Sequence, residues 1–141
     1  MNITASPLNS KVIAKYEVNI GTLYIFDNYV VGEYKDGLHV TFDDYEDVRD
    51  KIEKHFDDKP FGFIANRINS YSLEITEGPK FKKAFPNLMA YAVIAYTHQT
   101  KRNVELENHF YLFNRCCFDN LLEGEEWVSE QLRELTSSDV S

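Results

Sequence analysis

The fold is decided by the run Phe61-Gly62-Phe63-Ile64-Ala65-Asn66-Arg67-Ile68-Asn69-Ser70-Tyr71-Ser72. Its first five residues are continuously apolar, as expected of a strand that is covered on both faces of a sheet. The remainder turns abruptly into amides, hydroxyls and one guanidinium. Because ligands of α/β proteins gather where the strands end, this break marks a candidate site.

A second continuous apolar run, residues 88–96, follows and predicts another central strand. The segment between the two runs predicts a short helix over residues 77–85, since Pro79 is tolerated only in a first turn and Thr76 is placed to cap it. Two buried strands joined by a helical crossover indicate adjacent parallel strands with a right-handed connection.

The rest of the chain predicts further elements around this centre. Residues 12–20 alternate between apolar and polar, and residues 22–26 and 29–34 flank Asp27-Asn28, which favours an antiparallel meander. Helical spacing predicts helices over residues 43–56 and 98–111, then a last strand over residues 115–118 and a final helix to residue 135, capped by Asp119 or Asn120. We therefore expect a single α/β domain over residues 1–141, with one mixed sheet and about four packed helices.

Composition excludes several classes of function. The net charge of −8 opposes binding to nucleic acid and to anionic membrane surfaces. No segment approaches the length of an apolar membrane span, and the first residues lack a leader pattern, so a cytoplasmic protein is expected. Cys116 and Cys117 are adjacent and badly placed to bridge each other, which predicts two reduced thiols.

The polar break after the first apolar run supplies the candidate binding residues. They are Asn66, Arg67, Asn69, Ser70, Tyr71 and Ser72. One interpretation is that these groups satisfy the backbone of a tight loop, as Asn and Ser commonly do. The other is that they bind a partner or ligand, with Arg67 and Tyr71 as anchors carried at the edge of the sheet rather than in its core.

Enzymatic patterns are not found. The four histidines, His39, His55, His98 and His109, show no metal-ligand spacing, and there is no Cys-x-x-Cys. No phosphate-cradling loop and no Gly-x-Ser-x-Gly elbow occurs. The sequence thus predicts no catalytic residues, no metal site and no cofactor.

Several motifs resemble the SpoIIAA-like branch of the STAS/SEC14 proteins. They are the strand and loop over residues 61–72, the run Phe85-Pro86-Asn87-Leu88 leading into Ala90-Tyr91-Ala92-Val93, and Phe118-Asp119-Asn120-Leu121 with Glu126-Trp127-Val128. The resemblance covers roughly residues 12–135. It implies a regulatory module that binds a protein partner, while the SEC14 side of the name implies a lipid or other apolar ligand.

The resemblance also implies a phosphorylation switch at the start of the helix after the central strand. Thr76 is the only hydroxyl in the corresponding stretch Glu74-Ile75-Thr76-Glu77-Gly78, and the family's Asp and second Ser are missing. Glu74 and Glu77 would oppose a phosphate there. Thr76 therefore stands as a candidate phosphoacceptor beside the simpler interpretation as a helix cap.

Three hypotheses follow, and homodimerisation is compatible with each. The first is a non-catalytic protein-interaction module of STAS type, with its contact surface at residues 66–72 and the following helix. The second is a carrier or sensor of a small apolar or lipid-like ligand, and the third is an enzyme that uses Arg67 and a nearby serine. An internal apolar cavity above roughly 300 Å³ would favour the second, whereas a solid core with an exposed apolar patch beside that helix would favour the first.

Overall fold

A mixed six-stranded sheet forms the centre of the protein, whose computed structural model describes residues 1–138. Its antiparallel half consists of β1 (Ala14–Val18), β2 (Gly21–Ile25) and β3 (Tyr29–Tyr34). The predicted antiparallel meander is confirmed, although β1 covers only the middle of the alternating run.

The parallel half consists of β5 (Phe61–Arg67), β7 (Leu88–Ala95) and β8 (Arg115–Phe118). β5 lies between β3 and β7 and pairs with both in parallel, with Ile64 opposite Val31 on one side and Ala92 on the other. The strand order is β1-β2-β3-β5-β7-β8. The two continuous apolar runs are therefore adjacent central strands, as predicted.

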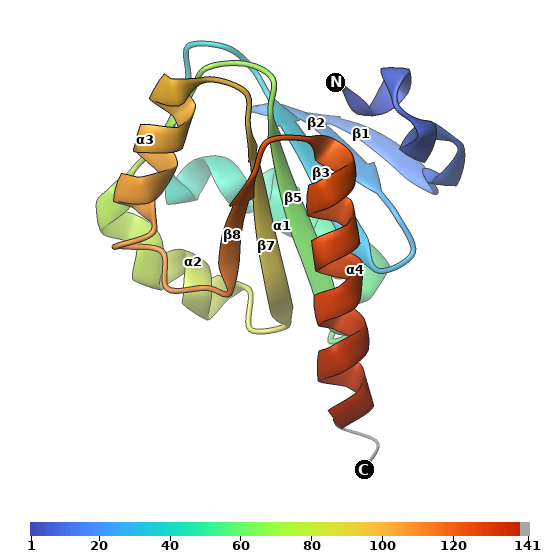
Figure 1. The fold of residues 1–141 in the computed structure, drawn as a ribbon. Coiled ribbons are helices and arrows are strands. Elements are labelled where there is room, and N and C mark those ends of the chain that lie inside the picture. Colours follow the sequence, from blue (N-terminus) through green and yellow to red (C-terminus); the bar gives the residue numbers. More distant parts are fainter. Residues whose placement is uncertain (139–141) are drawn as a thin grey trace.

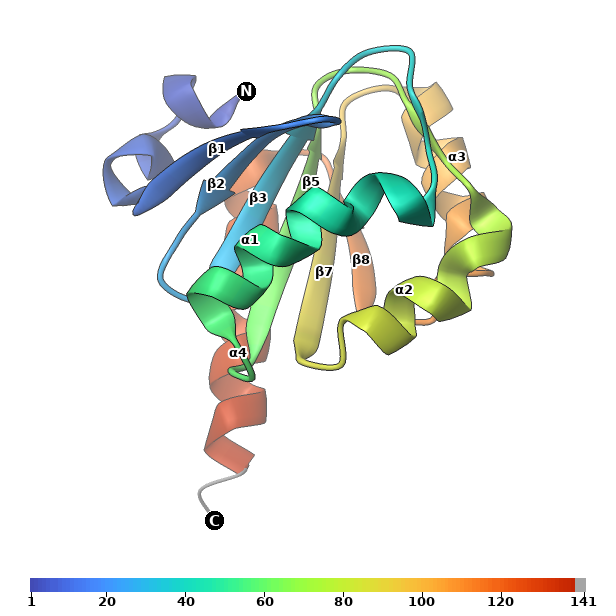
Figure 2. The same cartoon turned by 180° about the vertical axis from the view of Figure 1, so that it is seen from behind.

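Three helices connect the parallel strands: α1 (Glu46–Phe56), α2 (Gly78–Ala84) and α3 (His98–Glu107). Right-handed crossovers that step in one direction across a sheet deliver their helices to the same face. The last helix, α4 (Leu121–Ser138), follows β8 and runs back over the opposite face, against β7 and β5 (Figures 1 and 2).

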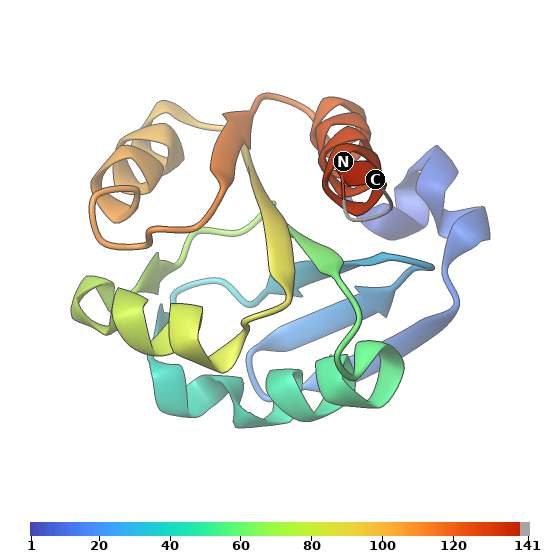
Figure 3. The same ribbon diagram turned by 90° about the horizontal axis from the view of Figure 1, so that it is seen from below.

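Helices therefore cover both faces of the sheet (Figure 3), and an apolar layer lies on each face. The layer under α1 and α2 is rich in aromatic rings and includes Tyr45, Ile52, Phe56, Phe61, Phe63, Phe81, Phe85 and Tyr91. The layer under α4 also takes in the N-terminal segment and includes Ile3, Leu8, Tyr29, Ile64, Ile94, Leu121, Val128 and Leu132. The division into two layers follows from helices on both faces.

The structure differs from the predicted elements in three places. A small separate sheet pairs β4 (His39–Val40) with β6 (Ser72–Leu73) in parallel, and it was not predicted because each strand has only two residues. The structure also contains short 3₁₀ helices that were not predicted: η1 (Ile3–Ala5), η2 (Pro7–Lys11), η3 (Phe42–Tyr45) and η4 (Ile75–Glu77). α3 ends at Glu107 and not at Tyr111, since the following residues turn away toward β8.

Two glycines allow α4 to approach the sheet closely. A Cβ on Gly62 in β5 would collide with Cγ1 of Val128, and a Cβ on Gly124 in α4 would collide with Cδ1 of Ile94. Gly124, which costs about 1 kcal/mol of helix propensity, is thus explained by packing.

No helix among residues 1–138 is both long and apolar enough to cross a membrane.

The contact between Gly62 and Val128 gives a first prediction. Gly62→Ala should destabilise the protein by about 1–3 kcal/mol, because the stiff β-branched Val128 cannot move out of the way within its helix. Adding Val128→Ala should recover part of the loss, giving a coupling of about 0.5–3 kcal/mol in a urea-unfolding double-mutant cycle. Additive losses would show that α4 does not pack on Gly62.

Candidate functional site

The last two residues of β5 point to opposite faces of the sheet. Successive side chains of a strand alternate, so Asn66 joins Gly62 and Ile64 under α4, while Arg67 joins the face that carries Phe63 and Ala65. Both are buried, with 0% and 3% exposure. Asn66 and Arg67 therefore belong to two separate buried networks, one on each face of the sheet.

On the α4 face, Asn66 binds the start of the chain. Its Nδ2 donates to the carbonyl of Met1 at 2.9 Å and to Oε2 of Glu33 at 2.8 Å. The same Glu33 oxygen accepts the backbone N–H of Ile3 at 2.8 Å, and the hydroxyl of Tyr96 donates to Oδ1 of Asn66 at 2.6 Å. Burial, with a smaller contribution from Glu33, raises the pKa of Tyr96 to about 12. This network fixes the N-terminal segment across the ends of β3, β5 and β7.

On the opposite face, Arg67 belongs to a buried ionic cluster. Its Nη2 lies 2.5 Å from Oε1 of Glu107, at the end of α3, and Nη2 of Arg115, at the start of β8, lies 3.1 Å from the same oxygen. All three side chains are no more than 3% exposed. One carboxylate thus ties β5, α3 and β8 together.

Tyrosine rings enclose this ionic cluster. The guanidinium of Arg67 lies 4.7 Å from the centre of the Tyr71 ring. That of Arg115 lies 4.8 Å from the Tyr91 ring and 5.3 Å from the Tyr111 ring. Such cation–π contacts stabilise a desolvated cation and replace part of its lost hydration.

The cluster is unbalanced in charge and in hydrogen bonds. It holds two guanidiniums and one carboxylate, and Nε and Nη1 of both arginines have no hydrogen-bond partner among the described residues. Burial opposes the charge on Arg67, but Tyr71 and Glu107 outweigh it and raise the pKa of that guanidinium. Burial likewise raises the pKa of Tyr71, Tyr91 and Tyr111, so these phenols are neutral at pH 7.

The exposed middle of the loop serves its own backbone. Nδ2 of Asn69 donates to the carbonyl of Tyr34 at 2.9 Å. The backbone N–H of Ser70 donates to Oδ1 of Asp36, and the carbonyl of Ser70 accepts from the backbone N–H of Gly37 at 2.7 Å. These contacts hold the loop against residues 34–37. They agree with the interpretation of the sequence in which the polar groups satisfy the backbone of a tight loop.

A chain of hydrogen bonds through His39 and Glu74 links Ser72 to Thr76 on the surface. Oγ of Ser72 lies 2.8 Å from Nδ1 of His39, and Nε2 of His39 lies 2.9 Å from Oε2 of Glu74. The hydroxyl of Thr76 donates to the other Glu74 oxygen at 2.8 Å. The hydrogen bonds from His39 and Thr76 lower the pKa of Glu74. This chain joins β4 to β6 at an exposed position.

Two sequence predictions about these residues are wrong. Arg67 and Tyr71 were expected at the edge of the sheet, but Tyr71 is only 6% exposed and both side chains lie in the core, because Glu107 and the rings draw the guanidinium inward. Thr76 was expected to cap the second helix, but it lies inside η4, and the residue that precedes α2 is Glu77. Thr76 is exposed, and its hydroxyl donates to Glu74.

Sequence reasoning missed Glu107, Arg115 and Glu33. A signal for Glu107 was present, since it follows Val104 by three residues and precedes Tyr111 by four, so it occupies the apolar face of α3. Glu33 and Glu107 lie 33 and 40 residues from their partners Asn66 and Arg67, and no local pattern joins them. Among the described residues, no group of three or more His, Cys, Asp and Glu side chains is placed to hold a metal ion.

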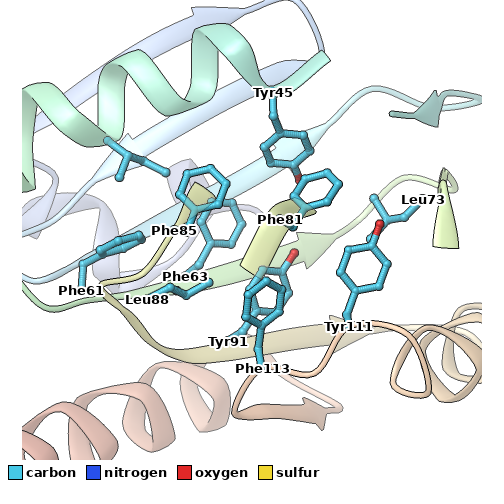
Figure 4. Close-up of a pocket in the computed structure, with 11 residues that line it drawn as sticks. Tyr45, Phe61, Phe63, Leu73, Phe81, Phe85, Leu88, Tyr91, Tyr111 and Phe113 are labelled. Atoms are coloured by element: carbon cyan, nitrogen blue, oxygen red, sulfur yellow. The ribbon is translucent and has the colours of Figure 1, made fainter. Parts of the chain in front are cut away.

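An apolar pocket lies between α1, α2 and the sheet (Figure 4). It is lined by Tyr45, Ile52, Phe61, Phe63, Leu73, Phe81, Phe85, Leu88, Tyr91, Tyr111 and Phe113. Its volume of about 20 Å³ is room for about one water molecule. The aromatic layer is therefore filled by its own side chains.

An exposed apolar patch lies beside α2. Leu106, Phe110 and Leu112, on the last turn of α3 and the segment before β8, are 52%, 39% and 65% exposed. The backbone of Phe110 approaches Gly78, the first residue of α2, so closely that a Cβ there would collide with the Phe110 carbonyl. We call these three residues together with Lys80, Lys82 and Lys83 of α2 the α2–α3 surface.

Comparison with known proteins finds no match, whether to a protein-family model, to a curated protein or to a solved structure.

The ionic cluster gives the second prediction. Glu107→Gln should cost about 3–5 kcal/mol of unfolding free energy, because it leaves two buried guanidiniums without a counter-charge. The matched control is Glu105→Gln, which removes an exposed carboxylate from the same helix and should change stability by no more than about 0.5 kcal/mol. Urea titration measures both, and equal small losses would mean that the cluster is open to water.

Proposed function

We propose that the protein is a cytoplasmic, non-catalytic regulatory module of STAS type that binds a protein partner through the α2–α3 surface. The proposal is supported above all by the exposed apolar patch of Leu106, Phe110 and Leu112 beside α2. Grouped exposed apolar side chains next to polar ones are typical of protein interaction sites.

Charge indicates what kind of partner this surface fits. Lys80, Lys82 and Lys83 are exposed on α2, in a chain whose net charge is −8. Among residues 1–138, Lys80 is the one of the three with an ion-pair partner, Glu77 at 3.3 Å, and such an exposed pair contributes little. A local group of lysines beside apolar side chains suits an acidic segment with apolar anchors.

The geometry narrows the contact surface expected from sequence. Asn66 and Asn69 donate to partners within the protein, and Arg67 is buried against Glu107, which leaves α2 and the neighbouring segment before β8 as the exposed part. Ser72 and Thr76 remain accessible at the rim, where Thr76 is still the candidate phosphoacceptor.

The observed fold class supports the STAS proposal in a general way. A mixed sheet with an antiparallel start, parallel central strands and four helices agrees with that resemblance. Cys116 and Cys117 are free thiols, as suits a reducing compartment.

The alternative, a carrier or sensor of a small apolar or lipid-like ligand, has less support. Sites for such ligands have volumes of roughly 300–1,000 Å³. The apolar pocket of about 20 Å³ is far smaller. A ligand would have to displace rings that already pack on one another, such as Phe63 on Tyr91 with centres 5.2 Å apart.

Partner binding is tested with a matched pair of surface substitutions. Leu112→Asp should reduce capture of the native partner from an extract at least tenfold. It should not change the midpoint of urea unfolding. Ile13→Asp, at a residue of similar exposure (61%) just before β1, should leave capture intact. Equal capture by wild type and both variants would contradict the proposed surface, and size-exclusion of each variant would show whether the partner is a second copy.

Ligand carriage is tested by extraction. Protein purified from its native source should yield no stoichiometric lipid by mass spectrometry, and a fluorescent fatty acid should not bind at micromolar concentrations, because the aromatic layer is already filled. A co-purifying lipid at one equivalent would reverse the choice between the two hypotheses.

A further inference from the structure

We infer that Arg67 and Arg115 bind one small monovalent anion of about the size of chloride. The inference is independent of the proposed partner surface. It rests on the charge and the hydrogen-bond balance of the ionic cluster formed by Arg67, Glu107 and Arg115.

The charges of the ionic cluster do not balance. Two guanidiniums face one carboxylate, and all three side chains are at most 3% exposed. The surrounding groups are Tyr71, Tyr91 and Tyr111, whose pKa values are raised, so none of them supplies a negative charge. The cluster therefore carries one excess positive charge away from water, and an unpaired buried charge is strongly destabilising.

The hydrogen bonds of the ionic cluster are also incomplete. Nε and Nη1 of both arginines are buried and have no hydrogen-bond partner among the described residues. Each buried donor left without a partner costs about 1–3 kcal/mol. The rings of Tyr71, Tyr91 and Tyr111 lie against the two guanidiniums and replace part of their lost hydration.

The charge and the hydrogen bonds together indicate the kind of ligand. A monovalent anion neutralises the excess charge, whereas a divalent oxyanion reverses its sign. An acceptor shared by one free nitrogen of each arginine also satisfies two of the four unpartnered groups. Arg67 and Arg115 both contact the same Glu107 oxygen, so the two guanidiniums lie next to each other. A halide meets the conditions of charge and hydrogen bonding with a single atom.

The test is the chloride dependence of unfolding at constant ionic strength, with sodium gluconate replaced stepwise by sodium chloride. A single ion bound only by the folded state makes the unfolding constant fall tenfold for each tenfold rise in chloride above its dissociation constant. Arg115→Gln leaves a neutral Arg67–Glu107 pair and should abolish this dependence. Arg102→Gln, which removes an exposed arginine from α3, should retain it.

A direct measurement covers the case in which Arg115→Gln does not fold. Wild-type crystals grown in sodium bromide should show an anomalous peak within about 3.5 Å of a free nitrogen of each arginine. A chloride slope of zero, the same slope in wild type and Arg115→Gln, or ordered water alone at the four nitrogens would overturn the inference.

Discussion

The carboxylate of Glu107 is the contact on which the parallel half of the structure depends. It holds Arg67 at the end of β5 and Arg115 at the start of β8, and so links two strands that are separated in the sheet by β7. It also fixes the end of α3 and the segment that leads to β8. That segment carries Phe110 and Leu112, so the position of the exposed patch depends on a buried ionic contact.

The antiparallel half depends on a second polar contact. Glu33 at the end of β3 and Asn66 at the end of β5 together bind the backbone of Met1 and Ile3. This holds Ile3 fully buried in the apolar layer under α4. The end of the sheet where α/β proteins commonly bind ligands is thus covered on this face by the chain's own first residues.

Sequence reasoning predicted the central features of the fold because they are expressed in local patterns. The apolar runs of β5 and β7 and the alternation of β1 report burial residue by residue. The roles of Arg67 and Tyr71 were not predictable in the same way. Their burial depends on Glu107 and Arg115, which lie 40 and 48 residues after Arg67 and have no pattern that points back to it. Predicting that a polar break is exposed assumes that no distant charge will satisfy it, and here one does.

The polar groups after β5 are bound within the protein, and we propose that a partner binds a different surface. The most direct measurement is hydrogen exchange at the arginine Nε–H groups by ¹⁵N NMR. Burial of the cluster predicts that Arg67 and Arg115 exchange at least a hundredfold more slowly than the exposed Arg102, with protection lost only on unfolding. Exchange of Arg67 at the rate of Arg102 would contradict the account, because the guanidinium would then be accessible for binding at the surface.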